Sequence, residues 1–231
     1  MTIRNELEDF VARTLREQWT TRDGRVVPDT DDLTLSNLAV TLDATVLYAD
    51  LAGSTEMVKA KKWHFSAEVY KTFLYASSRM IRHHDGTITA FDGDRVMGVF
   101  LGDRKNSNAA KAALRINWIA KELIQPAIKN QYPASTYTLR HRVGIDTSAI
   151  HVIRAGVRGS NDLVWVSNAA NNAAKMAALD PAYPSYISAA VYGRLNEKAK
   201  YSTKNGEDRW HDLGTHDLGY RIYGSTWWWS P

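Results

Sequence analysis

Short β-prone runs alternate with long amphipathic helical stretches, and this order constrains the fold more than any other feature of the chain. Residues 45–49 form a β-prone run ending at Asp50, and apolar positions recur at helical spacing from about residue 66 to 81. Two runs flanking an Asp-Gly-Asp turn, 87–91 and 95–100, predict a hairpin. This order is typical of an α+β fold, a mostly antiparallel sheet with packed helices, and its start matches the ferredoxin-like arrangement.

The rest of the chain extends the same pattern. Further elements are expected as a helix over 107–125, strands over 139–145, 149–153 and 163–166, an Ala-rich helix over 168–179 and a second hairpin near 209–224. We expect two parts, a helix with a connecting loop over 1–42 and the main domain over 43–231. The three tryptophans at 227–229 predict contact with a subunit surface, because such a cluster is costly to leave in water.

Composition excludes several classes of protein. The chain has 231 residues, a formal net charge of +4 and no cysteine, which rules out disulfides, iron–sulfur clusters and thiol nucleophiles. No apolar run approaches the about 18 residues of a membrane span, and the N-terminus lacks a signal-peptide pattern. We therefore expect a cytoplasmic protein without a membrane segment. The basic runs 59–62 and 140–142 are short, and we interpret them as solvated faces that bind no nucleic acid.

Two carboxylates occupy positions that suit metal binding. Asp50 ends the first strand of the main domain, and Asp94 lies on the tight turn of the hairpin. In a β-α-β-β core these strands are commonly neighbours, so the two carboxylates could share hard cations. A small-residue turn after Asp50 opens a helix, and the exposed amides of such a turn form a natural triphosphate cradle. Each Asp alone is more simply a turn residue, but the pair in this setting favours a two-metal phosphoryl-transfer site.

A third group of polar residues lies on the Ala-rich helix. Asn171 and Lys175 are spaced i and i+4, so both project from one face. An amide and a cation on one face could hold a ribose and stabilise charge on a phosphate during transfer. In isolation, a polar stripe on an amphipathic helix is the preferred interpretation of the same spacing.

Three motifs together resemble the class III nucleotidyl cyclases. Residues 46–55 (VLYADLAGST) are similar to the first-strand motif of that family, and 93–100 (GDRVMGVF) are similar to its hairpin motif. Residues 143–147 (VGIDT), followed by 166–175, resemble its later strand and Asn-x-x-x-Arg helix. The motifs stand in family order over residues 44–178, so their combination is far more specific than any one of them.

The resemblance implies a site and a reaction. Asp50 and Asp94 would hold two Mn²⁺ or Mg²⁺ ions with the carbonyl of Leu51, and Asn171 and Lys175 would act from the second subunit of a homodimer. The triphosphate would lie on backbone amides, those of Ala52, Gly53, Ser54 and Thr55. The ribose 3′-OH would attack the α-phosphate, giving a 3′,5′-cyclic nucleotide and pyrophosphate. Lys175 replaces the usual Arg, which keeps the charge but loses the planar fork.

The expected base-reading positions differ from those of purine-using relatives. Ala90 and Val164 stand where those relatives place polar side chains, and neither can hydrogen-bond a purine edge. Tyr48, two residues before Asp50, shares its face of the strand and would narrow the pocket, although a core aromatic is an equally simple interpretation. This pattern resembles the pyrimidine cyclases of Pycsar anti-phage systems, whose product activates a separate effector protein.

UTP is therefore the favoured substrate, with cyclic UMP as product. CTP remains open, because the two bases differ at one edge and no residue that reads this edge can be identified. Two further alternatives are an adenylate cyclase with an unusual pocket and a catalytically inactive cyclase-homology module that serves dimerisation. The presence of both metal carboxylates, Asn171 and a cation at 175 argues against the inactive module.

Overall fold

The computed structural model describes residues 2–180 and 182–230. Its contacts divide the chain into two compact units, Met1–Asp43 with Ala149–Ser167 (unit 1) and Ala44–Ser148 with Asn168–Pro231 (unit 2). The predicted division into 1–42 and 43–231 remains a prediction, and the contact-based units differ from it by grouping residues 149–167 with the N-terminal segment. Two long strands, β2 (Leu38–Leu51) and β5 (His141–Val157), run from one unit into the other.

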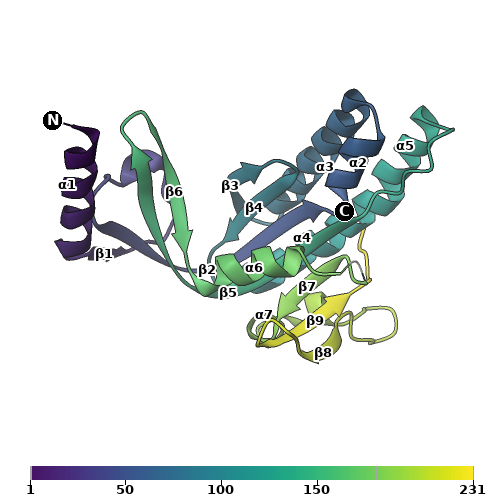
Figure 1. Ribbon diagram of the computed structural model, residues 1–231. Coiled ribbons are helices and arrows are strands. Elements are labelled where there is room, and N and C mark those ends of the chain that lie inside the picture. The colour runs from purple at the N-terminus through teal and green to yellow at the C-terminus, as the bar shows by residue number, and fades with distance from the viewer. Residues whose placement is uncertain (1, 181, 231) are drawn as a thin grey trace. The chain divides into compact units, whose positions relative to one another are not determined.

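Unit 1 contains α1 and a small sheet (Figure 1). Its elements are α1 (Ile3–Arg16), β1 (Thr20–Asp23), the 3-10 turn η1 (Thr30–Asp32), β6 (Ser160–Val166) and the unit 1 portions of β2 and β5. Here β1 pairs with β2 in parallel, and β6 pairs with β5 as an antiparallel hairpin. The connecting loop expected within 1–42, after the first helix, is therefore wrong in part, because residues 20–23 and 38–42 are strand. Backbone pairing across 18 residues of sequence decides this, which local propensity does not register.

Unit 2 holds the main sheet and most helices. Its remaining strands are β3 (Gly86–Asp92), β4 (Arg95–Phe100), β7 (Ser185–Ser188), β8 (His211–Thr215) and β9 (Arg221–Ser225). Its helices are α2 (Ser54–Ala60), α3 (Trp63–His83), α4 (Lys105–Ile119), the π-helical η2 (Ala120–Ile124), α5 (Gln125–Gln131), α6 (Asn168–Ala177), α7 (Ala189–Tyr192) and α8 (Glu197–Lys200). The strand order is β3-β4-β2-β5-β7-β9-β8, antiparallel at the β2–β4, β3–β4, β7–β9 and β8–β9 pairs and parallel between β5 and β7.

The predicted α+β class with a mostly antiparallel sheet is confirmed, and the later strands need one correction. The two strands expected over 139–145 and 149–153 form one continuous strand, β5. The residues between the two expected strands, 146–148, are polar, and the side chains of Asp146 and Thr147 have partners in the fold. Strand pairing thus continues through a polar stretch whose side chains are satisfied.

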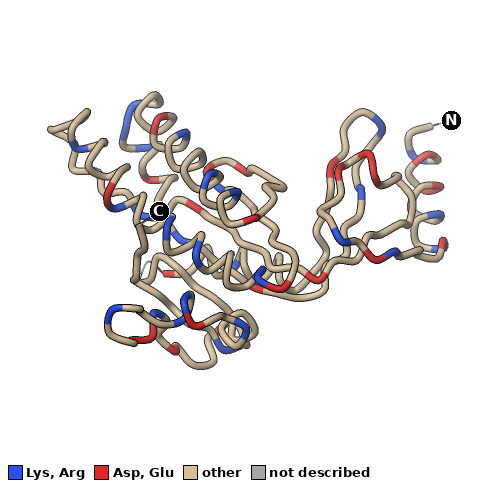
Figure 2. The backbone as a smooth tube through the Cα atoms, turned by 180° about the vertical axis from the view of Figure 1, so that it is seen from behind, with Lys and Arg blue, Asp and Glu red and all other residues tan. Residues whose placement is uncertain are grey.

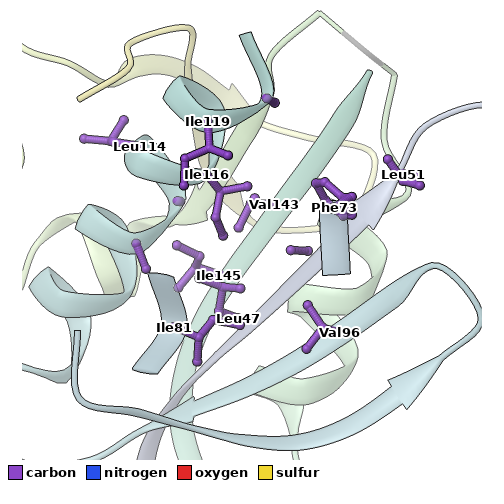
Figure 3. Close-up of a cluster of buried hydrophobic side chains, with 14 of the residues drawn as sticks. Leu47, Leu51, Phe73, Ile81, Val96, Leu114, Ile116, Ile119, Val143 and Ile145 are labelled. Carbon is purple, nitrogen blue, oxygen red and sulfur yellow. The ribbon is translucent and has the colours of Figure 1, made fainter. Parts of the chain in front are cut away.

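Helices α3 and α4 pack on one face of the unit 2 sheet, and Figure 3 shows buried side chains of this cluster. Leu47 and Ala49 of β2 and Val143 and Ile145 of β5 point into this layer, where Phe73, Ile81 and Leu114 of the helices are fully buried. Alternate strand residues point to opposite faces, so Tyr48 and Asp50 lie on the other face of the sheet. The α3–α4 layer therefore leaves that second face for the polar residues of the site.

The C-terminal tryptophans pack on their own unit. Trp227 and Trp229 contact the main core, the amide of Trp229 donates to the carbonyl of Leu114 (3.1 Å), and Arg209 stacks 5.1 Å from both ring centroids. Two of the three rings thus pack on their own chain, and contact of the cluster with a second subunit remains a prediction. A neighbouring cation and the core edge already shield these two rings from water.

Candidate active site

The structure brings the two predicted metal carboxylates together. Asp50 lies opposite Arg95 in the β2–β4 ladder, and Asp94 directly precedes Arg95 at the turn. Burial raises the pKa of Asp50, Arg95 lowers it, and the negative charge of Asp94 raises it again, so the net pKa lies above its ordinary value. Oδ2 of Asp94 is buried and has no hydrogen-bond partner. A crowded carboxylate pair with an unused buried oxygen fits a divalent cation, which binds oxygen ligands.

Arg95 is the cation nearest to this pair. Its Nη2 atom lies 3.5 Å from Oδ2 of Asp50, and its guanidinium carbon lies 5.9 Å from the centroid of the Tyr48 ring. The ion pair is long, and the pKa of Asp50 stays raised in spite of it. Arg95 therefore compensates the carboxylate charge only in part. Among the described residues no three His, Asp or Glu side chains cluster, so a metal site here would use two carboxylates and a backbone carbonyl.

Two of the three predicted base-pocket residues share the face of Asp50. Tyr48 and Ala90 both lie opposite Met97, one on each side of β4, so they form a row across β2, β4 and β3. The next row along the same face holds Asp50, Arg95 and Asp92. Burial raises the pKa of Tyr48, so its phenol stays protonated at neutral pH and can donate a hydrogen bond.

The third predicted base-pocket residue, Val164, belongs to unit 1. It lies on β6 opposite Ile153 of β5, and 43% of it is exposed. The side chain of Val164 is apolar and accessible. These two properties suit a residue that contacts a base but makes no hydrogen bond to the polar edge of that base.

The turn after Asp50 retains part of the predicted phosphate cradle. The side chain of Leu51 is buried in the core, so only its backbone can serve the site. Gly53 adopts a left-handed φ of 74° and caps α2, whose first amides, from Ser54 and Thr55, have no partner within the helix. The amide of Ala52 donates to the carbonyl of Arg140 at 2.8 Å. The predicted triphosphate cradle is therefore corrected at Ala52, because the amide of Ala52 already donates the hydrogen bond that joins the turn to the start of β5.

Two arginines that we interpreted as part of a solvated face, Arg140 and Arg142, lie near the turn after Asp50. Leu139, His141 and Val143 are buried, so Arg140 and Arg142 point to the opposite side, the face of Asp50. A guanidinium nitrogen of Arg140 lies 3.6 Å from the position of a Cβ on Gly53, and the charge of Arg142 lowers the pKa of Asp50. The signal in the sequence that could have identified Arg140 and Arg142 is their alternation with Leu139, His141 and Val143 along a strand.

Helix α6 presents the predicted catalytic pair to the outside. Asn171 and Lys175 are exposed, whereas Ala173 and Ala177 are buried. A Cβ on Gly144 of β5 would overlap the carbonyl oxygen of Ala173 and lie 2.7 Å from the amide nitrogen of Ala177, so α6 rests on the strand backbone itself. In the described part of the chain, no hydrogen bond or ion pair joins Asn171 or Lys175 to the carboxylate pair.

A buried carboxylate anchors α6. Asp146 is 5% exposed, its Oδ2 accepts from Nδ2 of Asn172 at 2.8 Å, and its Oδ1 accepts from the hydroxyl of Ser188. Burial raises the pKa of Tyr220 to about 12, and the negative charge of Asp146 contributes to this rise. Since Asn172 directly follows Asn171, this network orients the exposed face of α6.

Comparisons with known proteins agree with this geometry. The chain is 48% identical over 232 residues to a uridylate cyclase of Burkholderia cepacia and 46% identical over 231 residues to one of Xanthomonas perforans. The first match covers all of both chains, and the second covers 99% of each. A uridylate cyclase of a Rhodovulum strain is 39% identical over 237 residues, covering 100% of this chain and 99% of its own. No family model matches the chain.

Solved structures of class III cyclases share the fold. The adenylyl cyclase CyaB from P. aeruginosa superposes with a TM-score of 0.66 at 20% identity, over 81% of this chain and 95% of its own. A bacterial light-regulated adenylyl cyclase gives a TM-score of 0.68 at 18% identity over 81% of this chain, which spans about half of that protein (52%). No described helix is both long and apolar enough to cross a membrane. The chain is a nucleotidyl cyclase with the class III catalytic fold and belongs to the uridylate cyclase family.

Proposed function

We propose that the protein converts UTP to 3′,5′-cyclic UMP and pyrophosphate. The observation that carries the proposal is the Asp50–Asp94 pair, with its unused buried oxygen, on the same sheet face as Tyr48 and Ala90. Full-length relatives named uridylate cyclases support the choice of base. In the reaction a bond forms between the ribose 3′-oxygen and the α-phosphorus, the bond from that phosphorus to the bridging oxygen of the β-phosphate breaks, and the 3′-OH proton is lost.

Each group of the site has a task in this reaction. Asp50, Asp94 and the Leu51 carbonyl would hold two divalent ions, Mn²⁺ or Mg²⁺, which supply positive charge for the attacking and leaving oxygens. The amides of Gly53, Ser54 and Thr55 would hold the triphosphate, as helix N-termini do for anions. Arg140 lies close to the turn and Arg142 lies close to Asp50, so both would neutralise charge on the terminal phosphates of the substrate.

The remaining catalytic groups would come from a second copy. Asn171 would orient the ribose and Lys175 would stabilise charge developing on the α-phosphate. Both are exposed and have no contact with the carboxylate pair in the described residues of one chain. A homodimer that brings α6 of one copy over the site of the other would therefore complete the site.

The base pocket favours a small base. Ala90 and Val164 offer no side-chain hydrogen bond, so the polar edge of a purine would be left unpaired, which costs binding free energy. Tyr48 fills part of the space beside Asp50 and keeps a phenol proton for donation to the base. UTP is the favoured pyrimidine, CTP is the second candidate and ATP the third. We place the product as a cytoplasmic second messenger in Pycsar anti-phage defence, where it would act on a separate effector.

The test is incubation of the purified protein with Mn²⁺ and each of the four ribonucleoside triphosphates, with products identified by mass spectrometry. Cyclic UMP as main product, lost in Asp94→Asn and retained in the exposed control Asp103→Asn, is the expected result. Cyclic CMP or cyclic AMP as main product would refute the base assignment and leave the carboxylate site intact. Absence of product from all four would refute the reaction and favour an inactive cyclase-homology module.

A further inference from the structure

Helix α4 reaches solvent along one narrow strip. Of its residues Lys105–Ile119, ten are buried and five are partly exposed, those at 105, 108, 111, 115 and 118. Positions three or four residues apart lie on one side of a helix, so these five form a single line, the α4 strip. The helix contains no Asp or Glu, and its charged residues are all basic (Figure 2). Lys111 and Arg115 therefore stand on the strip one helical turn apart.

Two further cations border the strip. Arg104 directly precedes α4, and Lys198 lies on α8, whose N-cap amide donates to a serine hydroxyl of α4 at 2.9 Å. Burial lowers the pKa of Lys111, and the charges of Lys198, Arg104 and Arg115 lower it further. Charges shift the pKa of a neighbour in this way when they lie close to it. The four residues thus form one group, the α4 cation cluster.

Acidic side chains do not balance the α4 cation cluster. In the described part of the chain, no ion pair joins any of its four members to an Asp or Glu. Asp85, at the end of α3, brings one negative charge to the edge of the strip, where its Oδ2 accepts from Nδ2 of Asn108 at 3.1 Å. Like charges one helical turn apart, such as Lys111 and Arg115, destabilise a helix. The cluster therefore has an excess of positive charge that a bound anion would relieve.

The strip also offers hydrogen-bond donors that the fold does not use. Nε of Arg115 and Nε2 of His84 are shielded from solvent, and neither has a hydrogen-bond partner among the described residues. The guanidinium carbon of Arg115 lies 5.8 Å from the centroid of the Trp229 ring, which holds this side chain against the core. Burial lowers the pKa of His84 to about 4, so its ring is neutral at pH 7 and can donate one hydrogen bond. Buried donors without a partner cost free energy, and an acceptor at this place would satisfy them.

A small anion with several negative charges fits these donors best. The Cβ atoms of Lys111 and Arg115, one turn apart, are separated by about 5–6 Å, a span that a phosphate or two linked phosphates can bridge. A guanidinium can bind two phosphate oxygens at once, and such charge-assisted hydrogen bonds are stronger than neutral ones. A protein surface for a nucleic acid commonly makes about 6–10 phosphate contacts, more than this cluster can supply.

We propose that the α4 cation cluster binds a small phosphate-bearing anion, of the class of inorganic pyrophosphate, at a site separate from the carboxylate pair. Lys111 and Arg115 would bind the phosphate oxygens, and His84 would donate a further hydrogen bond. Helix α4 packs on the sheet face opposite to Asp50, so the anion would not contact the metal site. Pyrophosphate is a product of the proposed reaction, but this site does not depend on that reaction. Free pyrophosphate and the phosphates of a nucleotide share the same chemistry.

The experiment is isothermal titration calorimetry with sodium pyrophosphate in metal-free buffer. All proteins carry Arg140→Gln and Arg142→Gln, so that the cations near Asp50 do not bind the probe. On this background, Lys111→Gln combined with Arg115→Gln should raise the Kd at least about thirtyfold, because each change removes a hydrogen bond between charged groups. Pyrophosphate should also raise the Tm of the background protein but not that of the variant changed at 111 and 115.

The matched control removes two exposed cations elsewhere. Lys71→Gln on α3 combined with Lys129→Gln on α5 changes the net charge equally, and the Kd should stay within about twofold because distant charges are screened by salt. The variant changed at Lys111 and Arg115 should fold, since both side chains reach solvent and their repulsion is removed. Circular dichroism and the Tm without pyrophosphate check this.

The probes also identify the source of the phosphate. Tighter binding of UDP than of pyrophosphate, lost in the variant changed at Lys111 and Arg115, would assign the site to the phosphates of a nucleotide. Equal affinity and an equal rise in Tm in that variant and in the background protein would place the anion elsewhere and refute the proposal. The proposal would also be refuted by the absence of both signals with either probe, or by an oligouridylate that binds the cluster more tightly than pyrophosphate.

Discussion

The anchoring of α6 by Asp146 allows a sharp test of how the fold positions Asn171 and Lys175. Asn172→Ala removes the 2.8 Å bond to Oδ2 of Asp146 and leaves a 95% buried carboxylate without one partner. Removing one partner of a buried polar pair costs about 1–3 kcal/mol of unfolding free energy. The substitution also frees the exposed face of α6, and a displacement of about 1 Å in a catalytic group can lower the rate about a hundredfold.

Ser188→Ala is the matched control for stability. It removes the other bond to Asp146 and also the side-chain cap of α7, where the Ser188 hydroxyl accepts from the amide of Val191 at 3.3 Å. Its cost in unfolding free energy should equal or exceed that of Asn172→Ala. It lies on the strand side of the network, so the orientation of α6 depends on it less directly.

The assay is steady-state cyclase kinetics with metal and UTP, alongside urea unfolding. For Asn172→Ala we expect kcat to fall about ten- to hundredfold with KM within about threefold, because the triphosphate-binding groups are untouched. Ser188→Ala should keep kcat within about threefold, and Asp146→Asn, which can still accept from Asn172, should recover most of the rate lost in Asp146→Ala. Equal losses of kcat in Asn172→Ala and Ser188→Ala at equal stability would refute the positioning role.

Three further predictions concern stability. The raised pKa of Asp50 means that the fold disfavours its charged form, so Asp50→Asn should raise the Tm of the metal-free protein. The same substitution should abolish the increase in Tm on adding Mn²⁺. An unchanged Tm response to Mn²⁺ would exclude Asp50 as a ligand. Burial lowers the pKa of His141 to about 4, so between pH 6.5 and 4 the unfolded chain binds a proton that the folded chain does not. The free energy of unfolding should therefore fall by up to about 1.4 kcal/mol per pH unit as the pH drops through this range. Urea unfolding at pH 7 and 5 should show this loss, which His141→Phe should reduce and the exposed control His64→Phe should not. Gly144→Ala should cost about 1–3 kcal/mol of unfolding free energy by displacing α6, whereas Gly193→Ala, where a Cβ meets only one atom at 3.4 Å, should cost less; equal losses would contradict the close packing of α6.

Local patterns were sufficient for much of the fold. The spacing of apolar residues predicted α3 and α6, and the Asp-Gly-Asp turn predicted the β3–β4 hairpin, because periodicity and turn chemistry depend on neighbours in sequence. The order of the elements predicted the α+β class, and the three motifs predicted the cyclase family; the solved structures and the full-length relatives confirm both. The approach of Asp94 to Asp50 followed from one expected strand pairing.

Other features needed the tertiary structure. Strand β1 is four exposed residues without a strand pattern and exists because β2 pairs with it. Arg140 and Arg142 resemble a solvated run until the burial of His141 shows which face they share with Asp50. Asp146 anchors α6 only because partners 26 and 42 residues away converge on its two oxygens. Sequence alone thus determined most helices and strands and the carboxylates proposed for the site, whereas long-range strand pairing and helix packing decided the remaining strands and which polar groups meet.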